Sequence, residues 1–292
     1  MQTLKVDLFL PFAQYRNPFT FFYAQTFPLP PKSTIVGMLQ NLTGEYFDNK
    51  YWDLKICVFG IQESIFWNYQ QLIKGVPVPV KSDFVKEEIG KSGKVMQIKE
   101  TKVDYSTLTG GDKLPLYGVS KKSQRTPVYQ QEIYNLRLTI FIKHEDVTFI
   151  QGIKSSFANL RKVMHLGRSE DIFFIRKAPE IVTFEEKELW DFSSTFGSYI
   201  LRADNSILVN EKHFPVYSIP TRSIFELNEK PIQSQKELFS NKQNIKRKVD
   251  YNTVYYAENN RLVFLEKKPV MFYKGEIEGN EIKYYLIDQS WL

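Results

Sequence analysis

The chain has 292 residues, of which 42% are hydrophobic and 25% are charged, so it can bury one large core or two modest ones. It lacks an apolar run near the roughly 18 to 20 residues that cross a bilayer, and its alternating N-terminal segment is typical of a strand rather than a signal peptide, so we expect a cytoplasmic protein without membrane contact. Its single cysteine, Cys57, excludes intramolecular disulfides and cysteine-rich zinc modules, whereas the net charge of +6 and the 17 Tyr and 23 Phe residues suit nucleic acid.

The first 65 residues predict a strand, a helix and a second strand. Apolar and polar residues alternate over residues 4–10, which is the period of a half-buried strand. Over residues 35–46 the apolar positions recur at helical spacing after two prolines, which predicts a helix with Ser33 or Thr34 as its N-cap. Residues 54–65 are apolar and rich in β-branched side chains, so they predict the next strand.

A third strand, a second helix and a fourth strand follow further along the chain. Residues 134–142 alternate as a strand does. Apolar positions then step by three and four up to Met164, which predicts an amphipathic helix with Asp146 as its N-cap and Gly167 as its terminator. Residues 171–176 predict a last short strand. The order β-α-β-β-α-β is that of the ferredoxin-like fold.

An insertion of about residues 68–132 separates the second and third predicted strands. The stretch from Asn68 to Gln131 carries eleven Lys or Arg residues against six Asp or Glu, so most of the net positive charge lies there. Short β-like runs at residues 76–80 and 95–99 predict an irregular hairpin that projects from the sheet.

The predicted fold class is therefore α+β. A ferredoxin-like domain would span residues 1–177 and would contain the long basic β-hairpin insertion. Short β-like stretches in residues 178–292 predict a small β-rich C-terminal domain.

Two motifs carry a resemblance to a known family. The first is AQTFPLPPKSTIVGML at residues 24–39, and the second is HLGRSEDIFF at residues 165–174. They resemble two signatures of the CRISPR-associated Cas family five, a branch of the RAMP superfamily of RNA-binding proteins: its opening helix, P-P-K-S-x-x-x-G-h-L, and its L-G-R-S-E-F/D segment, the counterpart of the RAMP glycine-rich loop. Order and spacing agree over roughly the first 177 residues, whereas the last third adds little.

The resemblance implies an RRM-like palm and a β-hairpin thumb. It also implies the function of a non-catalytic subunit that holds the five-prime handle of the crRNA in a type I Cascade ribonucleoprotein, here type I-B-like, in antiviral defence. The implied partners are the crRNA, the backbone subunit whose filament the protein would cap and the large subunit, with target DNA nearby. In the type I-C branch the family's own member cuts the pre-crRNA, so a metal-independent endoribonuclease is the alternative function.

The start of the first predicted helix offers a candidate phosphate site. The glycines of a P-loop are missing, which argues against nucleotide hydrolysis. Free helix amides near Ser33 and the ammonium of Lys32 could instead hold an RNA phosphate, and Arg16 is a comparable candidate. The alternative is that these residues only start a helix. We expect Gly37, one turn later, to permit close packing of the helix on the sheet.

A second cluster lies where the second predicted helix ends. Here Gly167 would let backbone amides approach a phosphate, and Arg168 could bind a phosphate or a base edge through two hydrogen bonds. Alternatively the cations complement the helix C-terminus, and Arg168 pairs with Glu170. The RNA-binding candidates of this cluster are Arg161, Lys162, His165, Gly167, Arg168 and Ser169.

Cations alternate with aromatic rings in the second half of the insertion, as they do in proteins that neutralise phosphates and stack on bases. The alternative is a solvated loop, and the same two readings apply to the basic run Lys246-Arg247-Lys248. The candidates in the insertion are Lys113, Tyr117, Lys121, Lys122, Arg125 and Tyr129.

Neither a metal nor a cofactor is expected. The three histidines are isolated in the sequence, without a spacing typical of metal ligands. Ribonuclease chemistry without a metal would need a general base and a general acid. His165 is the only histidine in an RNA-facing motif, and no spacing identifies a partner for it, so we expect no catalytic residue unless the alternative function holds.

Overall fold

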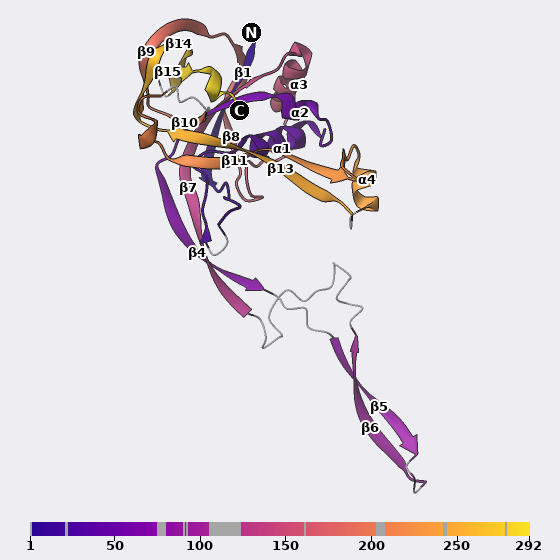
Figure 1. The fold of residues 1–292 in the computed structure, drawn as a ribbon. Coiled ribbons are helices and arrows are strands. Elements are labelled where there is room, and N and C mark those ends of the chain that lie inside the picture. The colour runs from indigo at the N-terminus through magenta and orange to yellow at the C-terminus, as the bar shows by residue number, and fades with distance from the viewer. Residues whose placement is uncertain are drawn as a thin grey trace. The chain divides into compact units, whose positions relative to one another are not determined.

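The protein is described here by a computed structural model, which covers residues 2–20, 23–74, 80–89, 91, 93–104, 124–160, 162–202, 208–241, 244–277 and 279–292. The chain forms two compact units (Figure 1). One consists of Met1–Asn68 and Gln130–Leu292, and the other is Tyr69–Tyr129. The second unit coincides closely with the insertion predicted at residues 68–132.

The larger unit is built on one long sheet with the strand order β12-β11-β13-β10-β3-β7-β1-β8. Two further strands, β2 (Tyr23–Ala24) and β4 (Ser64–Lys74), pair with β7. The strands of the main path are β1 (Thr3–Ala13), β3 (Lys55–Ile61), β7 (Gln124–Lys143), β8 (Phe174–Val182), β10 (Gly197–Leu201), β11 (Val216–Leu227), β12 (Lys230–Pro231) and β13 (Lys246–Ala257).

Four of these strands and two helices occur in the predicted chain order. β1 pairs antiparallel with β7, from Leu4↔Ile142 to Ala13↔Ile133, and also with β8. The helix α1 (Lys32–Thr43) follows β1 and β2, and α3 (Val147–Ala158) follows β7. The short helices α2 (Lys50–Asp53) and α4 (Gln235–Ser240) and the turns Glu211–His213 and Asp288–Ser290 complete the helical elements of the described chain.

Strand alternation gives the sheet two buried faces, because successive side chains point to opposite sides. Apolar residues of β1 such as Leu8 pack with Leu39 of α1 and Ile153 of α3 on one face, where both helices lie (Figure 1). On the other face, Phe141 of β7 packs with Tyr284 of a second sheet. That sheet has the order β15-β14-β9 and comprises β9 (Glu185–Ser194), β14 (Asn260–Ile277) and β15 (Asn280–Leu286).

The predicted boundary after residue 177 does not coincide with the division of the structure. Residues 178–292 contribute β10, which pairs with β3, and β11, β12 and β13 extend the same sheet beyond it. Val254 of β13 is buried in the cluster that also contains residues of β1 and α1. The last third therefore shares the core of the first third, and it also forms a second hydrophobic cluster of its own, which includes Phe192, Phe264 and Val270.

The predicted start of α1 and the predicted end of α3 need correction. The N-cap of α1 is Pro31, without a side-chain cap, so the prediction of Ser33 or Thr34 was wrong. Asp146 does cap α3, by accepting a hydrogen bond from the Phe149 amide. The helix ends at Ala158, before Met164. Met164 is buried, but in a loop, and Gly167 therefore terminates no helix.

The smaller unit contains an antiparallel hairpin of β5 (Val80–Ile89) and β6 (Val95–Asp104). Its register runs without interruption from Val80↔Asp104 to Ile89↔Val95. Among the described residues of the whole chain, no helix is long and apolar enough to span a membrane.

Candidate nucleic-acid interface

The two sequence motifs meet around one pocket of about 360 Å³. Ser33 and Gly37 of α1 line it together with His165 and Gly167 from the loop after α3. We call it the motif pocket. Its other lining residues are Thr34, Met38, Gln40, Asn41, Trp52, Ser223 and Arg247.

The first turn of α1 contributes Ser33 and Thr34 to the motif pocket, and its N-cap, Pro31, makes no side-chain cap. The Thr34 and Ile35 amides donate to the Pro31 carbonyl at 3.0 and 3.2 Å. The amides of Lys32 and Ser33 have no acceptor among the described residues. Because a helix N-terminus carries partial positive charge and free N–H donors, this turn suits an anion.

Lys32 itself lies outside the motif pocket. It is half-buried and lines a different cavity, with Lys55 and Lys143 as neighbours. The pKa of Lys32 is lowered to about 8, first by burial, with Asp53 acting in the opposite sense and the nearby cations Arg222 and Lys55 adding to the effect of burial. The ammonium of Lys32 is therefore short of counter-charge.

The loop of the second motif is organised by a buried carboxylate. Asp171 is 0% exposed, and its Oδ2 accepts hydrogen bonds from the amides of Gln14 (3.1 Å) and Arg168 (2.8 Å). The Arg168 guanidinium donates to its Oδ1 at 2.8 Å. These charge-assisted bonds tie the loop to the end of β1 and fix the positions of His165 and Gly167.

Gly167 is required by this arrangement. Its φ is +121°, in the region that L side chains rarely adopt. A Cβ there would lie 2.7 Å from Oδ2 of Asp171 and 3.0 Å from the Gln14 carbonyl oxygen. The glycine of the motif thus allows the close approach of loop and β1.

Arg168 has a structural role in the same loop. Besides Asp171 it contacts Glu132 of β7, where its Nη1 donates at 2.9 Å, and Glu170, whose carboxylate lies 3.5 Å from its Nε. Burial lowers the pKa of Arg168, but the hydrogen bonds that it donates to Asp171 and Glu132 outweigh this effect, so the net shift is upward. With its side chain 21% exposed, Arg168 mainly stabilises the loop; contact with RNA stays a prediction.

Two other candidates of the motif loop have intramolecular partners. Lys162 donates from Nζ to the carbonyl and side-chain oxygens of Asn41 in the last turn of α1, both at 2.7 Å. It therefore complements the C-terminus of α1, not that of the helix it follows. Ser169 donates to Glu170 at 3.0 Å. Arg16, in contrast, is exposed and bridges Thr26 only through its backbone.

His165 is half-buried at the motif pocket. Its backbone bridges Ile172, and its imidazole has no hydrogen-bond partner among the described residues. No group of His, Cys, Asp and Glu in that part of the chain could hold a metal ion. The imidazole is thus available to a ligand, but it lacks the carboxylate that would orient a catalytic base.

Sequence reasoning missed four residues that line the motif pocket and lie outside both motifs: Gln40, Asn41, Trp52 and Ser223. Arg247 belongs to the basic run of residues 246–248, but its link to the motifs depends on the long-range pairing of β11 and β13. Nε of Arg247 donates to Oγ of Ser223 at 2.8 Å, while its two terminal nitrogens have no partner among the described residues.

Gly37 does not permit close packing as predicted. A Cβ at this position would have nothing within 4 Å, and the residue is exposed. The absence of a side chain instead keeps the motif pocket open beside the first turn of α1.

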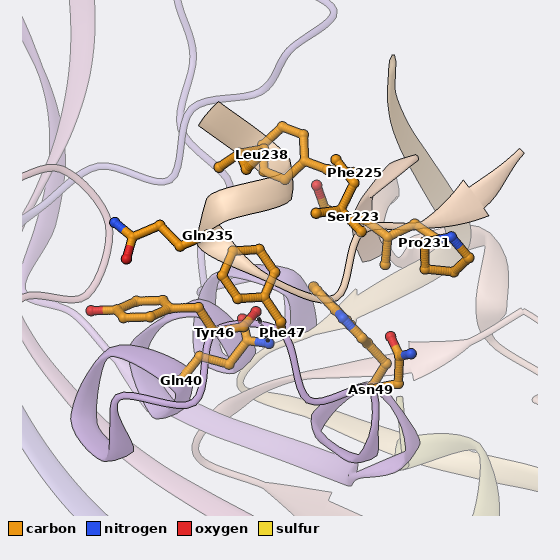
Figure 2. A pocket seen from close by; sticks show the side chains of 12 residues that line it. Gln40, Tyr46, Phe47, Asn49, Ser223, Phe225, Pro231, Gln235 and Leu238 are labelled. Atoms are coloured by element: carbon orange, nitrogen blue, oxygen red, sulfur yellow. Dashed lines mark hydrogen bonds between the residues drawn. The ribbon is translucent and has the colours of Figure 1, made fainter. Parts of the chain in front are cut away.

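A second pocket of about 340 Å³ shares Gln40, Trp52 and Ser223 with the motif pocket. We call it the aromatic pocket. Figure 2 shows Tyr46 and Phe47, which follow α1, on one side of this space and Phe225 and Leu238 on the other. The remaining lining residues are Asn49, Ile224, Pro231, Ile232 and Gln235.

The candidates of the insertion lie mostly beyond the described part of the chain. Tyr129 is described: it is 55% exposed and meets the ring of Tyr69 edge-on, with ring centres 5.3 Å apart. An exposed ring of this kind is available for stacking. The candidates outside the described residues are Lys113, Tyr117, Lys121, Lys122 and Arg161, together with the side chain of Arg125.

Several solved structures are distantly similar. One, a CRISPR RNA-guided surveillance complex, has 12% identity over 89% of this chain and 91% of that chain, with a TM-score of 0.47. A second, a crystal structure of a Cas protein, has 12% identity, coverages of 90% and 95% and a TM-score of 0.40. A third, a Type III-B Cmr-beta bound to cognate target RNA and AMPPnP, has 12% identity, coverages of 90% and 86% and a TM-score of 0.32.

No curated protein matches the sequence. The family assignment rests instead on the family Cas_Cas5d, described as CRISPR-associated protein (Cas_Cas5), which matches residues 3–225. The match includes both motifs and most of the larger unit. The chain therefore belongs to the Cas5 family of CRISPR-associated proteins.

Proposed function

We propose that this protein is the non-catalytic subunit of a Cascade-type complex that holds the five-prime handle of the crRNA, and that the motif pocket grips the RNA backbone. The observation that carries the proposal is the convergence of Ser33, His165 and Arg247 on one pocket. These residues come from three distant parts of the chain, and each can bind an anion.

The chemistry of the motif pocket matches a phosphodiester. The free amides of α1 would donate to a phosphate oxygen. The terminal nitrogens of Arg247 would donate to two oxygens at once, because Ser223 already holds Nε and orients the guanidinium. His165 could add a further hydrogen bond.

The aromatic pocket would take a base of the same strand. Single-stranded RNA is commonly recognised by splayed bases that stack on aromatic rings and whose edges bind polar groups. Tyr46, Phe47 and Phe225 supply rings, and Gln235 supplies an amide. The wall that the two pockets share would place a phosphate and a neighbouring base on either side of Trp52.

At the level of the fold, the order β8-β1-β7-β3 with α1 and α3 as crossovers supports a ferredoxin-like palm. The β5–β6 hairpin would be the thumb. The remaining parts of the proposal follow from the family: the protein would cap the backbone filament and contact the large subunit of a type I-B-like complex.

The endoribonuclease alternative is weaker on the described residues. General acid–base cleavage needs a second titrating group within reach of the reacting atoms. His165 has no carboxylate or second imidazole beside it, and Arg168 is neutralised by Asp171 and Glu132. We therefore propose that a separate enzyme matures the crRNA.

Handle binding can be tested with Arg247→Gln in the complex with partner subunits. We expect the affinity for RNA that carries the cognate repeat handle to fall about tenfold, because a bidentate contact is lost. Arg261→Gln is a matched control, since Arg261 is exposed and pairs with Asp191 on the second sheet. Equal affinities of wild type and Arg247→Gln would contradict the proposal.

A further inference from the structure

A third cavity, of about 510 Å³, lies beside the start of α1. Ammonium groups from three elements line it: Lys32 from α1, Lys55 from β3 and Lys143 from β7. We call it the lysine pocket. Asp53, Asp288, Trp291 and Leu292 complete the lining, and the lysine pocket shares no lining residue with the motif pocket.

Two of these lysines face each other across neighbouring strands. Lys55 and Lys143 are direct partners in the antiparallel register of β3 and β7. Like charges in such a pair are destabilising. Nζ of Lys143 lies 3.8 Å from the ring centre of Trp291, which is only 7% exposed, so a cation–π contact holds this ammonium in place of a carboxylate.

Three lysines outnumber the two aspartates among the residues that line the lysine pocket. Within the described residues, neither Asp53 nor Asp288 forms an ion pair with any of the three lysines. Burial lowers the pKa of Lys143, Lys55 lowers it further, and Asp288 acts in the opposite sense. Lys32 is affected in the same way. An anion in the cavity would favour the charged forms of both lysines.

We propose that the lysine pocket binds a phosphate group. In the RNA complex this would be a backbone phosphate adjacent to the one in the motif pocket, so this part rests on the proposed function. Lys32 and Ser33 are consecutive, and the first lines the lysine pocket while the second lines the motif pocket. A strand that crosses the start of α1 therefore passes from one pocket to the other.

The lysine pocket would contribute affinity without sequence specificity. Lysine ammoniums are flexible point charges, which neutralise a phosphate but do not read a base edge as an arginine fork does. The ring of Trp291 packs against Phe184 and lies beneath Lys143. It therefore positions a cation and offers no open face for a base.

The first experiment uses inorganic phosphate as the probe and needs no RNA. Phosphate, compared with chloride at equal ionic strength and pH 7, should raise the Tm of the full chain by at least about 2 °C. Lys143→Gln and Lys55→Gln should lose this shift. Lys143→Arg should keep it, because arginine preserves the charge and the stacking on Trp291. Lys283→Gln on β15 is the matched control outside all three pockets.

The second experiment measures handle-RNA affinity of the assembled complex at several salt concentrations. Lys55→Gln should lower the slope of log K against log salt by about 0.7, the value for one phosphate of a single strand. Lys55 is exposed, so this substitution should leave folding intact even if Lys143→Gln does not. Discrimination between handle sequences should be unchanged.

The outcomes separate this inference from the proposed function. An equal phosphate shift in wild type and Lys55→Gln, or no shift in either, overturns the lysine pocket as an anion site. A phosphate shift of the expected kind with an unchanged salt slope overturns its role in RNA binding. If the wild-type complex binds no handle RNA but the phosphate shift follows the lysine variants, the proposed function fails while the anion site stands.

Discussion

Nη2 of Arg168 lies 2.8 Å from Oδ1 of Asp171, a carboxylate with no exposed surface. This pair holds the second motif against the end of β1. An arginine that the sequence presents as an RNA ligand thus shapes the loop that carries His165 and Gly167, and the positions of both residues at the motif pocket depend on it.

Asp171→Asn should therefore impair both folding and RNA binding. The amide would place a donor near the Gln14 or Arg168 N–H and leave the guanidinium partly unpaired. We expect a loss of about 3 kcal/mol in the free energy of unfolding, measured by urea denaturation. Glu170→Gln, which alters an exposed partner of Arg168, should change stability by less than about 0.5 kcal/mol. Similar stabilities for the two variants would show that the buried carboxylate is not the anchor.

Gly167→Ala tests the backbone of the same loop. The added methyl group would meet Asp171 and the Gln14 carbonyl at a φ that alanine disfavours. We therefore expect the free energy of unfolding to fall by about 2 to 3 kcal/mol. Gly152→Ala provides the control, because Gly152 lies in α3 and a Cβ there has nothing within 4 Å. That change should stabilise the protein by up to about 1 kcal/mol. The result fails our expectation if both substitutions move the Tm in the same direction.

Gly37→Asp separates the electrostatics of the motif pocket from its folding. The site has room for a side chain, so the fold should persist, while a carboxylate beside Ser33 and Arg247 should repel a phosphate. We expect handle-RNA affinity to fall at least tenfold. Gly37→Asn introduces a side chain of the same shape without charge, so it should lower the handle-RNA affinity much less. If the two variants bind equally, the motif pocket does not hold a phosphate.

The strands β1, β3, β7 and β8 and the helices α1 and α3 could be predicted because their apolar residues recur with the periods of strands and helices. The end of α3 could not, since Leu160 and Met164 continue the helical spacing although Met164 is buried in a loop. Periodicity reports which residues are buried, and a buried loop residue at the right spacing looks like one more helical turn.

The motif pocket was predictable only in part. Ser33, His165 and Gly167 stand out in the sequence, but Arg247 reaches them through the pairing of β10 with β3 and of β13 with β10. Such long-range pairings leave no local signal. Likewise the segment RSED contains two acids, and nothing in the sequence indicates that Asp171 is the buried one.

Lys32→Met should reveal the cost of a desolvated ammonium. Because the pKa of Lys32 in the folded protein is about 8, below its unfolded value, the charged lysine destabilises the fold below pH 8, and this penalty is relieved as pH rises toward 10.5. Without phosphate, Lys32→Met should be more stable than wild type by about 1 to 2 kcal/mol at pH 7, allowing for partial exposure. The difference in stability between the two proteins should narrow by pH 10. A difference that is constant with pH would mean that the side chain acts through packing alone.

The last prediction concerns the insertion, which carries most of the net positive charge of the chain. Charge reversal of Lys121, Lys122 and Arg125 to Glu should weaken handle-RNA binding at least tenfold at 50 mM salt, and less at 200 mM, because screening reduces a long-range electrostatic effect. The Tm should stay within a few degrees of wild type, since the larger unit has its own core. Replacing residues 86–130 by a short Gly/Ser linker should likewise leave that core folded but abolish handle binding and assembly with the partner subunits. The charge-reversed protein should still bind inorganic phosphate in the lysine pocket, which distinguishes a lost thumb from a damaged palm. Wild-type assembly with guide RNA by the charge-reversed protein would identify the insertion as a solvated loop and confine RNA recognition to the pockets around α1.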